Sequence, residues 1–225
     1  MIKCDFKSFL HSAPEKLDGF PVGSRVYKGF QGSGKTLSMV HYTLKMLQEY
    51  PDCLCFSNIM ISHPRVTYFS TPDELQRILT ITNGVNGVLI VLDEAHLFWG
   101  RKAGISLDVL TAISQQRKDR RRIVLSSQIW EELDISLRKQ VKEIVQCNSI
   151  MRTIIINRVY DGETLTYDKM QSQYVADLKD IYIYHMTKDE VSKYNTYQKI
   201  VTNNDYERSS SSSLMHLVTS VNLKK

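Results

Sequence analysis

The segment from Gly29 to Thr36 contains the residue types that bind a chain of phosphates. In order it reads Gly29, Phe30, Gln31, Gly32, Ser33, Gly34, Lys35 and Thr36. This order fits the P-loop pattern, in which glycines let backbone amides and a helix N-terminus point at the β- and γ-phosphates. The lysine adds positive charge there, and the threonine hydroxyl coordinates Mg²⁺. We therefore expect the segment to bind ATP and Mg²⁺; the alternative is a glycine-rich turn with a capping threonine.

Two carboxylates stand at the end of the apolar run from Val88 to Leu92. Asp93 is expected to hold Mg²⁺ together with Thr36, and Glu94 to polarise a water molecule for attack on the γ-phosphate. An acidic pair at a strand end is common on its own. In the same chain as a P-loop, however, this pair predicts ATP hydrolysis.

Gln128 follows a second short run, Ile123 to Ser127, that is expected to be a strand. A polar side chain at this place can hydrogen-bond the γ-phosphate or the attacking water. The alternative is an ordinary polar residue at a strand end. The run stands where the next strand of the sheet is expected, so we favour the functional interpretation.

Three side chains after the acidic pair each have two interpretations. His96 can contact substrate or can be a polar residue near the site. Phe98 and Trp99, which precede Arg101 and Lys102, can mark a pore loop that touches DNA or can be buried aromatics.

The chain reads Arg-Lys-Asp-Arg-Arg-Arg from Arg117 to Arg122. This cluster has three interpretations, namely a solvated loop, a contact to DNA phosphates, and an arginine finger that reaches a neighbouring subunit's ATP. Arg117 is the first candidate for the finger and Arg122 the second. Both precede the strand that starts near Ile123. A guanidinium at this place, just before the strand, can extend towards another subunit.

The rest of the sequence predicts the elements that position these residues. Strands are expected at 25–28, 53–57, 66–69, 88–92 and 123–127, and helices at 34–49, 72–80 and 106–116. Short apolar strands that alternate with helices predict an α/β fold with a doubly wound, mainly parallel sheet, which binds ligands at the carboxyl ends of its strands. Residues 143–168 are β-rich with a turn at 161–162, which predicts an antiparallel C-terminal extension of this sheet.

The pattern also predicts how the chain is divided. Residues 1–21 have no clear period and are expected to form an irregular arm, and residues 22–200 the nucleotide-binding domain. A capping box at 187–190 predicts a late helix. Residues 201–225 are polar and serine-rich, which is typical of a tail of low order.

Composition excludes several classes of protein. Of the 225 residues 42% are hydrophobic and 24% charged, the balance of a soluble globular protein. No apolar run approaches the ~20 residues that cross a bilayer, and no signal-peptide pattern is present, so we expect no transmembrane segment. The net charge of +5 says only that acidic partners are tolerated.

The cysteines indicate a reducing compartment. Cys4, Cys53, Cys55 and Cys147 are too few and too scattered for a disulfide framework in a chain of this length. Cys53 and Cys55 alternate as in a strand, which favours buried thiols over zinc ligands.

Five segments together resemble the additional-strand, RecA-like P-loop ATPases of the FtsK/HerA superfamily. They are Gly29–Thr36, Leu92–His96, the pair Gln116-Arg117 before a strand that ends in Ser127-Gln128, Ser57–Ile59, and Lys193–Thr196, which has Asn195 where the family has aspartate. Within the superfamily, the chain is most similar to zonula occludens toxin-like ATPases of filamentous phages and to packaging ATPases of tailless, membrane-containing icosahedral viruses.

The resemblance implies an ATP-driven motor that moves double-stranded DNA with little sequence preference. It further implies a ring-shaped homo-oligomer, capsid vertex or portal proteins as partners, and a place in the host cytoplasm or the virion. Phage extrusion proteins typically carry a transmembrane segment after the ATPase domain, where this chain has its serine-rich tail, so we favour genome packaging over extrusion. A scaffold that assembles on ATP without turnover is the non-enzyme alternative.

Overall fold

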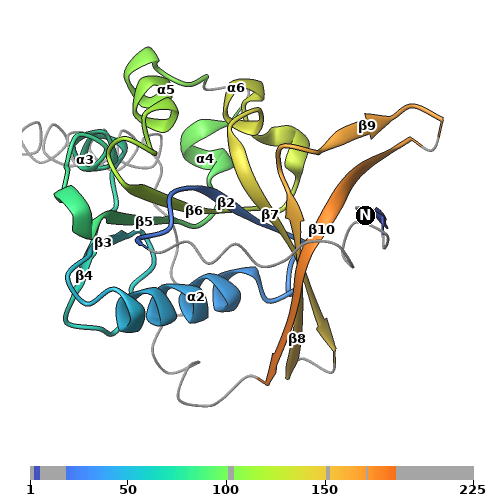
Figure 1. The fold of residues 1–225 in the computed structure, drawn as a ribbon, viewed down its shortest axis with the longest axis horizontal. Coiled ribbons are helices and arrows are strands. Elements are labelled where there is room, and N and C mark those ends of the chain that lie inside the picture. Colours follow the sequence, from blue (N-terminus) through green and yellow to red (C-terminus); the bar gives the residue numbers. More distant parts are fainter. Residues whose placement is uncertain (1–2, 6–18, 101–103, 151–152, 171, 186–225) are drawn as a thin grey trace, which may run out of the picture.

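The computed structural model describes residues 3–5, 19–100, 104–150, 153–170 and 172–185. These residues form a ten-stranded mixed sheet with the order β1-β10-β8-β7-β2-β6-β5-β3-β4, and β9 pairs with β10 beside this path. Helix α2 covers one face of the sheet, whereas α3, α4, α5 and α6 lie on the other (Figure 1). This arrangement is the α/β fold predicted from the sequence.

The parallel half of the sheet contains the strands that the sequence predicted. It consists of β2 (Gly23–Lys28), β6 (Arg121–Ser127), β5 (Val88–Leu92), β3 (Leu54–Ser57) and β4 (Val66–Tyr68). All neighbouring pairs in this series run parallel. Their carboxyl ends therefore share one edge of the sheet, which we call the carboxyl edge. The opposite edge, where these strands begin, is the amino edge.

The other half is the antiparallel extension that the β-rich pattern predicted. β7 (Val141–Ile150) pairs parallel with β2, and β8 (Ile154–Asp161) then runs antiparallel to β7. β10 (Gln173–His185) pairs antiparallel with both β8 and β9 (Thr166–Asp168). β1 (Lys3–Asp5), inside the arm expected to be irregular, pairs parallel with β10. Its pairing joins residues far apart in the sequence, which no local pattern reveals.

The helices agree with their predicted positions to within a few residues. They are α2 (Lys35–Glu49), α3 (Pro72–Ile78), α4 (His96–Trp99), α5 (Leu107–Ser114) and α6 (Ile135–Arg138), with 3₁₀ turns at Gly84–Asn86 and Trp130–Glu132. A complete capping box between Thr71 and Glu74 starts α3. The short helices α4 and α6 were not predicted, because four residues carry no readable helical period.

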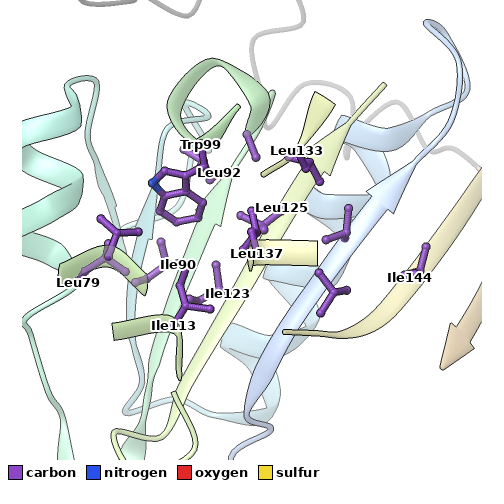
Figure 2. Close-up of a cluster of buried hydrophobic side chains, with 14 of the residues drawn as sticks. Leu79, Ile90, Leu92, Trp99, Ile113, Ile123, Leu125, Leu133, Leu137 and Ile144 are labelled. Carbon is purple, nitrogen blue, oxygen red and sulfur yellow. The ribbon is translucent and has the colours of Figure 1, made fainter. Parts of the chain in front are cut away.

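The hydrophobic core occupies both faces of the sheet. In β5, Ile90 and Leu92 pack under α4 and α5, whereas Leu89 and Val91 face the cluster beneath α2. Figure 2 shows the first cluster, in which Trp99 lies among aliphatic side chains from β5, β6 and α6. All five residues of β5 are buried, as expected for a central strand covered on both faces.

This packing decides between the alternatives for one aromatic pair and for one cysteine pair. Trp99 is 4% exposed, and Phe98 packs against the same cluster, so both are core aromatics rather than a pore loop. The thiols of Cys53 and Cys55 are buried in the cluster beneath α2. Arg101, Lys102, most of the predicted arm, the capping box at 187–190 and the serine-rich tail lie outside the described residues. In the described part, no helix has the length and hydropathy of a membrane span.

Candidate active site

The P-loop joins the end of β2 to the start of α2. Gly32 and Gly34 have φ angles of 78° and 88°, a left-handed conformation that favours glycine. Space is also limited, because a Cβ atom on Gly34 would lie 2.5 Å from the Cδ1 atom of Ile155. On Gly29 it would lie 2.8 Å from the carbonyl oxygen of Cys147. The pattern therefore needs glycine here both for backbone geometry and for close packing.

Lys35 and Ser33 have the surroundings of phosphate ligands. The Nζ atom of Lys35 donates to the carbonyl oxygen of Phe30 at 3.2 Å, so the lysine lies along the loop, and its residue is 6% exposed. The hydroxyl of Ser33 is buried and has no hydrogen-bond partner among the described residues. An oxyanion in the loop would supply that partner. Phe30 is 89% exposed, and Gln31 and Gly32 are also exposed.

Thr36 and Asp93 meet across the carboxyl edge. The Oγ1 atom of Thr36, in the first turn of α2, donates to the Oδ2 atom of Asp93 at 2.9 Å. Asp93 follows β5 directly and is 9% exposed. A hydroxyl and a carboxylate are oxygen ligands of the kind that Mg²⁺ prefers, so these residues fit the ion that the P-loop implies.

Two residues that the sequence analysis gave no role hold Asp93 in place. The Nδ2 atom of Asn58 donates to the carbonyl oxygen of Asp93 at 3.0 Å, and the Asp93 amide donates to Asn58 Oδ1 at 2.7 Å. The hydroxyl of Ser126 donates to Asp93 Oδ1. Both partners stand on or beside strands that flank β5. Their polar character near a strand end was the available signal, but their convergence depends on the strand order.

The surroundings of Asp93 suit a bound cation. Burial raises the pKa of Asp93, and hydrogen bonds from Ser126 and Thr36 oppose the shift only in part. No ion pair involves Asp93 in the part of the chain that the structure describes. The carboxylate thus has neutral donors around it and its charge is not neutralised by a side chain.

Glu94 and Gln128 are in direct contact. The Nε2 atom of Gln128 donates to Glu94 Oε1 at 3.0 Å. Glu94 has a φ angle of 51°, and its amide donates to the hydroxyl of Ser126 at 2.8 Å. His96 Nδ1 lies 3.4 Å from Glu94 Oε2. The structure therefore brings Thr36, Asp93, Glu94 and Gln128 into one connected network.

Comparison with known proteins identifies the family. The profile described as Zonular occludens toxin (Zot) matches residues 25–202, which is most of the chain. The chain belongs to the zonular occludens toxin family. This Zot-family membership confirms the resemblance on which the sequence interpretation rested. No curated protein sequence matches the chain.

Solved structures support the same fold for this Zot-family chain. The N-terminal domain of zonular occludens toxin from Neisseria meningitidis is 23% identical, with a TM-score of 0.56 over 77% of this chain and 98% of that one. The genome packaging NTPase B204 from Sulfolobus turreted icosahedral virus 2, in complex with ATP-gammaS, is 12% identical, with a TM-score of 0.51 over 70% and 98%. The fold is that of a P-loop NTPase.

The structure splits the arginine cluster of the Zot-family chain into a buried part and an exposed part. Arg122, the second finger candidate, is 3% exposed and lies near the start of β6 at the amino edge, opposite Gly23. Its Nε atom donates to the Tyr42 hydroxyl at 2.9 Å, and its Nη2 atom pairs with Glu143. A guanidinium held in this way is not available to another subunit, so the candidacy of Arg122 is corrected. Its place in a strand, rather than in the loop before it, is the reason.

Glu143, whose side chain is 21% exposed, is the shared partner of two arginines. Its Oε2 atom lies 3.2 Å from Arg25 Nε as well as beside Arg122. Burial alone would raise the pKa of Glu143, but the two guanidinium groups outweigh it and lower the pKa to about 2.

Arg117 lies on the turn between α5 and β6 and is exposed, as are Lys118 and Arg120. This turn is at the amino edge, opposite Thr36 and Asp93. Arg117 therefore cannot reach the phosphates of its own subunit. A solvated turn, a DNA contact and a finger directed at a neighbour stay as the interpretations of this exposed part.

Proposed function

We propose that the chain is a Mg²⁺-dependent ATPase that moves double-stranded DNA, most specifically a viral genome-packaging ATPase. The observation that carries the proposal is the network of Thr36, Asp93, Glu94 and Gln128 beside the P-loop. In one place it combines oxygen ligands for a cation, a carboxylate for a base and an amide for orientation.

Each group has a role in hydrolysis. The P-loop amides and Lys35 would bind the phosphates, and Thr36 with Asp93 would hold Mg²⁺, which neutralises phosphate charge when bound. Glu94 would take the proton of a water molecule as its oxygen bonds to the γ-phosphorus. The bond between that phosphorus and the ADP oxygen breaks, so ADP and phosphate are the products. Gln128 would orient the water or the γ-phosphate.

The proposal for DNA rests on family membership and on the packaging NTPase of similar fold. A motor that handles a whole genome must grip phosphates rather than bases, so we expect binding with little sequence preference and a steep dependence on salt. We further propose a ring-shaped homo-oligomer, docking to a capsid vertex or portal protein, and a place in the host cytoplasm or the virion. Family membership keeps filamentous-phage-type DNA extrusion as the second candidate function.

The test is ATP hydrolysis with and without duplex DNA. Glu94→Gln should bind ATP about as wild type does and lower turnover by on the order of 10²–10⁴-fold, because it removes the base but keeps the size of the side chain. Lys35→Ala should weaken ATP binding itself. Equal loss of affinity in both variants would contradict the assigned roles. Assembly on ATP without any turnover by wild type would favour the scaffold instead.

Arg117 is the candidate finger that the structure leaves, and mixing subunits tests it. Pure Arg117→Ala should be inactive but regain activity when mixed with Glu94→Gln, because some interfaces then pair an intact glutamate with an intact arginine. Lys118→Ala, a neighbouring exposed cation, is the matched control and should be active alone. Mixed rings that form but recover no activity would reject the finger and leave the DNA contact or the solvated turn.

A further inference from the structure

His96 is a contact of the Glu94 carboxylate that the hydrolysis scheme does not use. Its Nδ1 atom faces Glu94 Oε2 at 3.4 Å, while Gln128 occupies the other oxygen at 3.0 Å. The side chains of His96 and Glu94 are 23% and 24% exposed, so neither is freely solvated. Each oxygen of the carboxylate thus has its own neighbour.

The two facing atoms of this contact attract each other only when a proton lies between them. The facing atoms, His96 Nδ1 and Glu94 Oε2, are both buried and have no hydrogen-bond partner in the described part of the chain. Two bare acceptors at this distance would repel each other and remain unsatisfied. A proton on Nδ1 turns the imidazole into a donor towards Oε2, and a small shortening of the 3.4 Å separation completes the hydrogen bond.

The backbone holds His96 against Glu94. The left-handed conformation of Glu94 turns the chain, and the Leu97 amide donates to the Glu94 carbonyl oxygen at 2.9 Å. Ala95 is fully buried, and its amide donates to the Ser126 carbonyl oxygen at 2.9 Å. Trp99 anchors the end of the same short helix in the core. The turn that carries His96 is thus fastened to β6 and to the core.

We propose that His96 is a positioning residue, whose Nδ1–H orients the carboxylate of Glu94 for proton transfer from water. The proposal rests on the proposed ATPase function. A donor on each oxygen restricts rotation of the carboxylate and leaves its remaining lone pairs for the water. Loss of the imidazole should therefore lower kcat for ATP by about tenfold through misorientation of the base. It should not change ATP affinity, because the contact of His96 is with Glu94 rather than with the phosphate-binding loop.

Three substitutions separate the donor from mere bulk. His96→Asn places an amide N–H close to the position of Nδ1 and should retain most of the activity. His96→Gln places its amide near Nε2 and should lose activity as His96→Ala does. Leu97→Ala, next in the same helix, is the control and should be close to wild type. Equal activity in all three His96 variants, whether high or low, would overturn the proposal, as would a change confined to KM.

A measurement that does not depend on turnover separates this inference from the proposed function. In protein with ¹⁵N-labelled histidine, the NMR signals of His96, assigned by their loss in His96→Asn, should show a proton on Nδ1. Glu94→Ala should remove that preference. A neutral His96 with a bare Nδ1 would overturn the proposal whether or not ATP is hydrolysed. Wild-type protein that holds this proton but hydrolyses no ATP would instead refute the proposed function, and with it the positioning role of His96 in hydrolysis.

Discussion

Asp93, which is buried, and Glu143, whose side chain is 21% exposed, lie at opposite edges of the same sheet and have opposite surroundings. Asp93 receives hydrogen bonds from the neutral hydroxyls of Thr36 and Ser126, and its pKa is raised. Glu143 lies between Arg25 and Arg122, and its pKa is lowered to about 2. The first carboxylate has charge left for a cation that arrives from solution, whereas the second is already neutralised. Burial alone therefore does not distinguish a metal ligand from a structural ion pair.

The largest expected effect is the loss of activity on neutralising Asp93. Asp93→Asn keeps the size of the side chain but removes the charge that would hold Mg²⁺, so ATPase activity should fall by on the order of 10²–10³-fold. Urea unfolding should show little loss of stability, because a buried charge is removed with it. A large loss of stability together with normal turnover of the folded fraction would mean that Asp93, like Glu143, has a structural role rather than a role in binding Mg²⁺.

The next largest effect is expected on neutralising Glu143, which should reduce stability but leave activity unchanged. Glu143→Gln leaves the guanidinium groups of Arg25 and Arg122 buried without their anion, which should lower the free energy of unfolding by about 3 kcal/mol. ATPase activity per folded molecule should stay close to wild type. Asp161→Asn, which removes a more exposed pair with Lys179, is the control and should cost much less. A stable but inactive Glu143→Gln protein would place Glu143 in the active site instead.

The surroundings of Asp93 show which parts of the site could be predicted from the sequence and which could not. The P-loop and the acidic pair are each contiguous in the chain, so the sequence alone was enough to predict that they lie at the same edge of the sheet. Asn58 and Ser126 reach Asp93 only because β3 and β6 flank β5, and local patterns do not determine strand order.

Two further residues show the same limit. Arg122 was the second finger candidate because a charge run hides the point where a strand begins. His96 approaches Glu94 because of a left-handed backbone turn that the residue types do not announce. The interpretations that failed or stayed open thus depended on long-range pairing or on a single backbone conformation.

A smaller loss of stability is expected when the pH is lowered. Because Glu143 has a lowered pKa when folded, its stabilisation is present above its ordinary pKa of 4.5 and is lost as the pH falls towards about 2. With allowance for partial exposure, this loss should be about 2 kcal/mol. Urea titrations at several pH values should therefore show the difference between wild type and Glu143→Gln shrink below pH 4.5. A difference in stability that stays constant with pH would mean that the ion pairs with Arg25 and Arg122 do not set the pKa of Glu143.

The smallest expected effect is the stabilisation of the folded protein against heat by bound Mg²⁺. With ADP present, Mg²⁺ at ten times its Kd should stabilise wild type by about 1.4 kcal/mol in thermal unfolding, and Asp93→Asn by much less. Because the pKa of Asp93 is raised, protons compete for the carboxylate at a higher pH than for an ordinary aspartate. Protection should therefore weaken on the acid side. Equal protection of both proteins would assign the ion to ADP alone.

The central position of β2 has a consequence for synthesis on the ribosome. Its hydrogen-bonded neighbours are β6, from Arg121, and β7, from Val141, so both partners are translated long after Gly23–Lys28. The strands β3, β4 and β5 can meet earlier, but the strand that precedes the P-loop waits with both edges unpaired. Exposed strand edges of this kind invite association between nascent chains. The P-loop is thus completed among the last parts of the parallel sheet, after β6 and β7 have been translated.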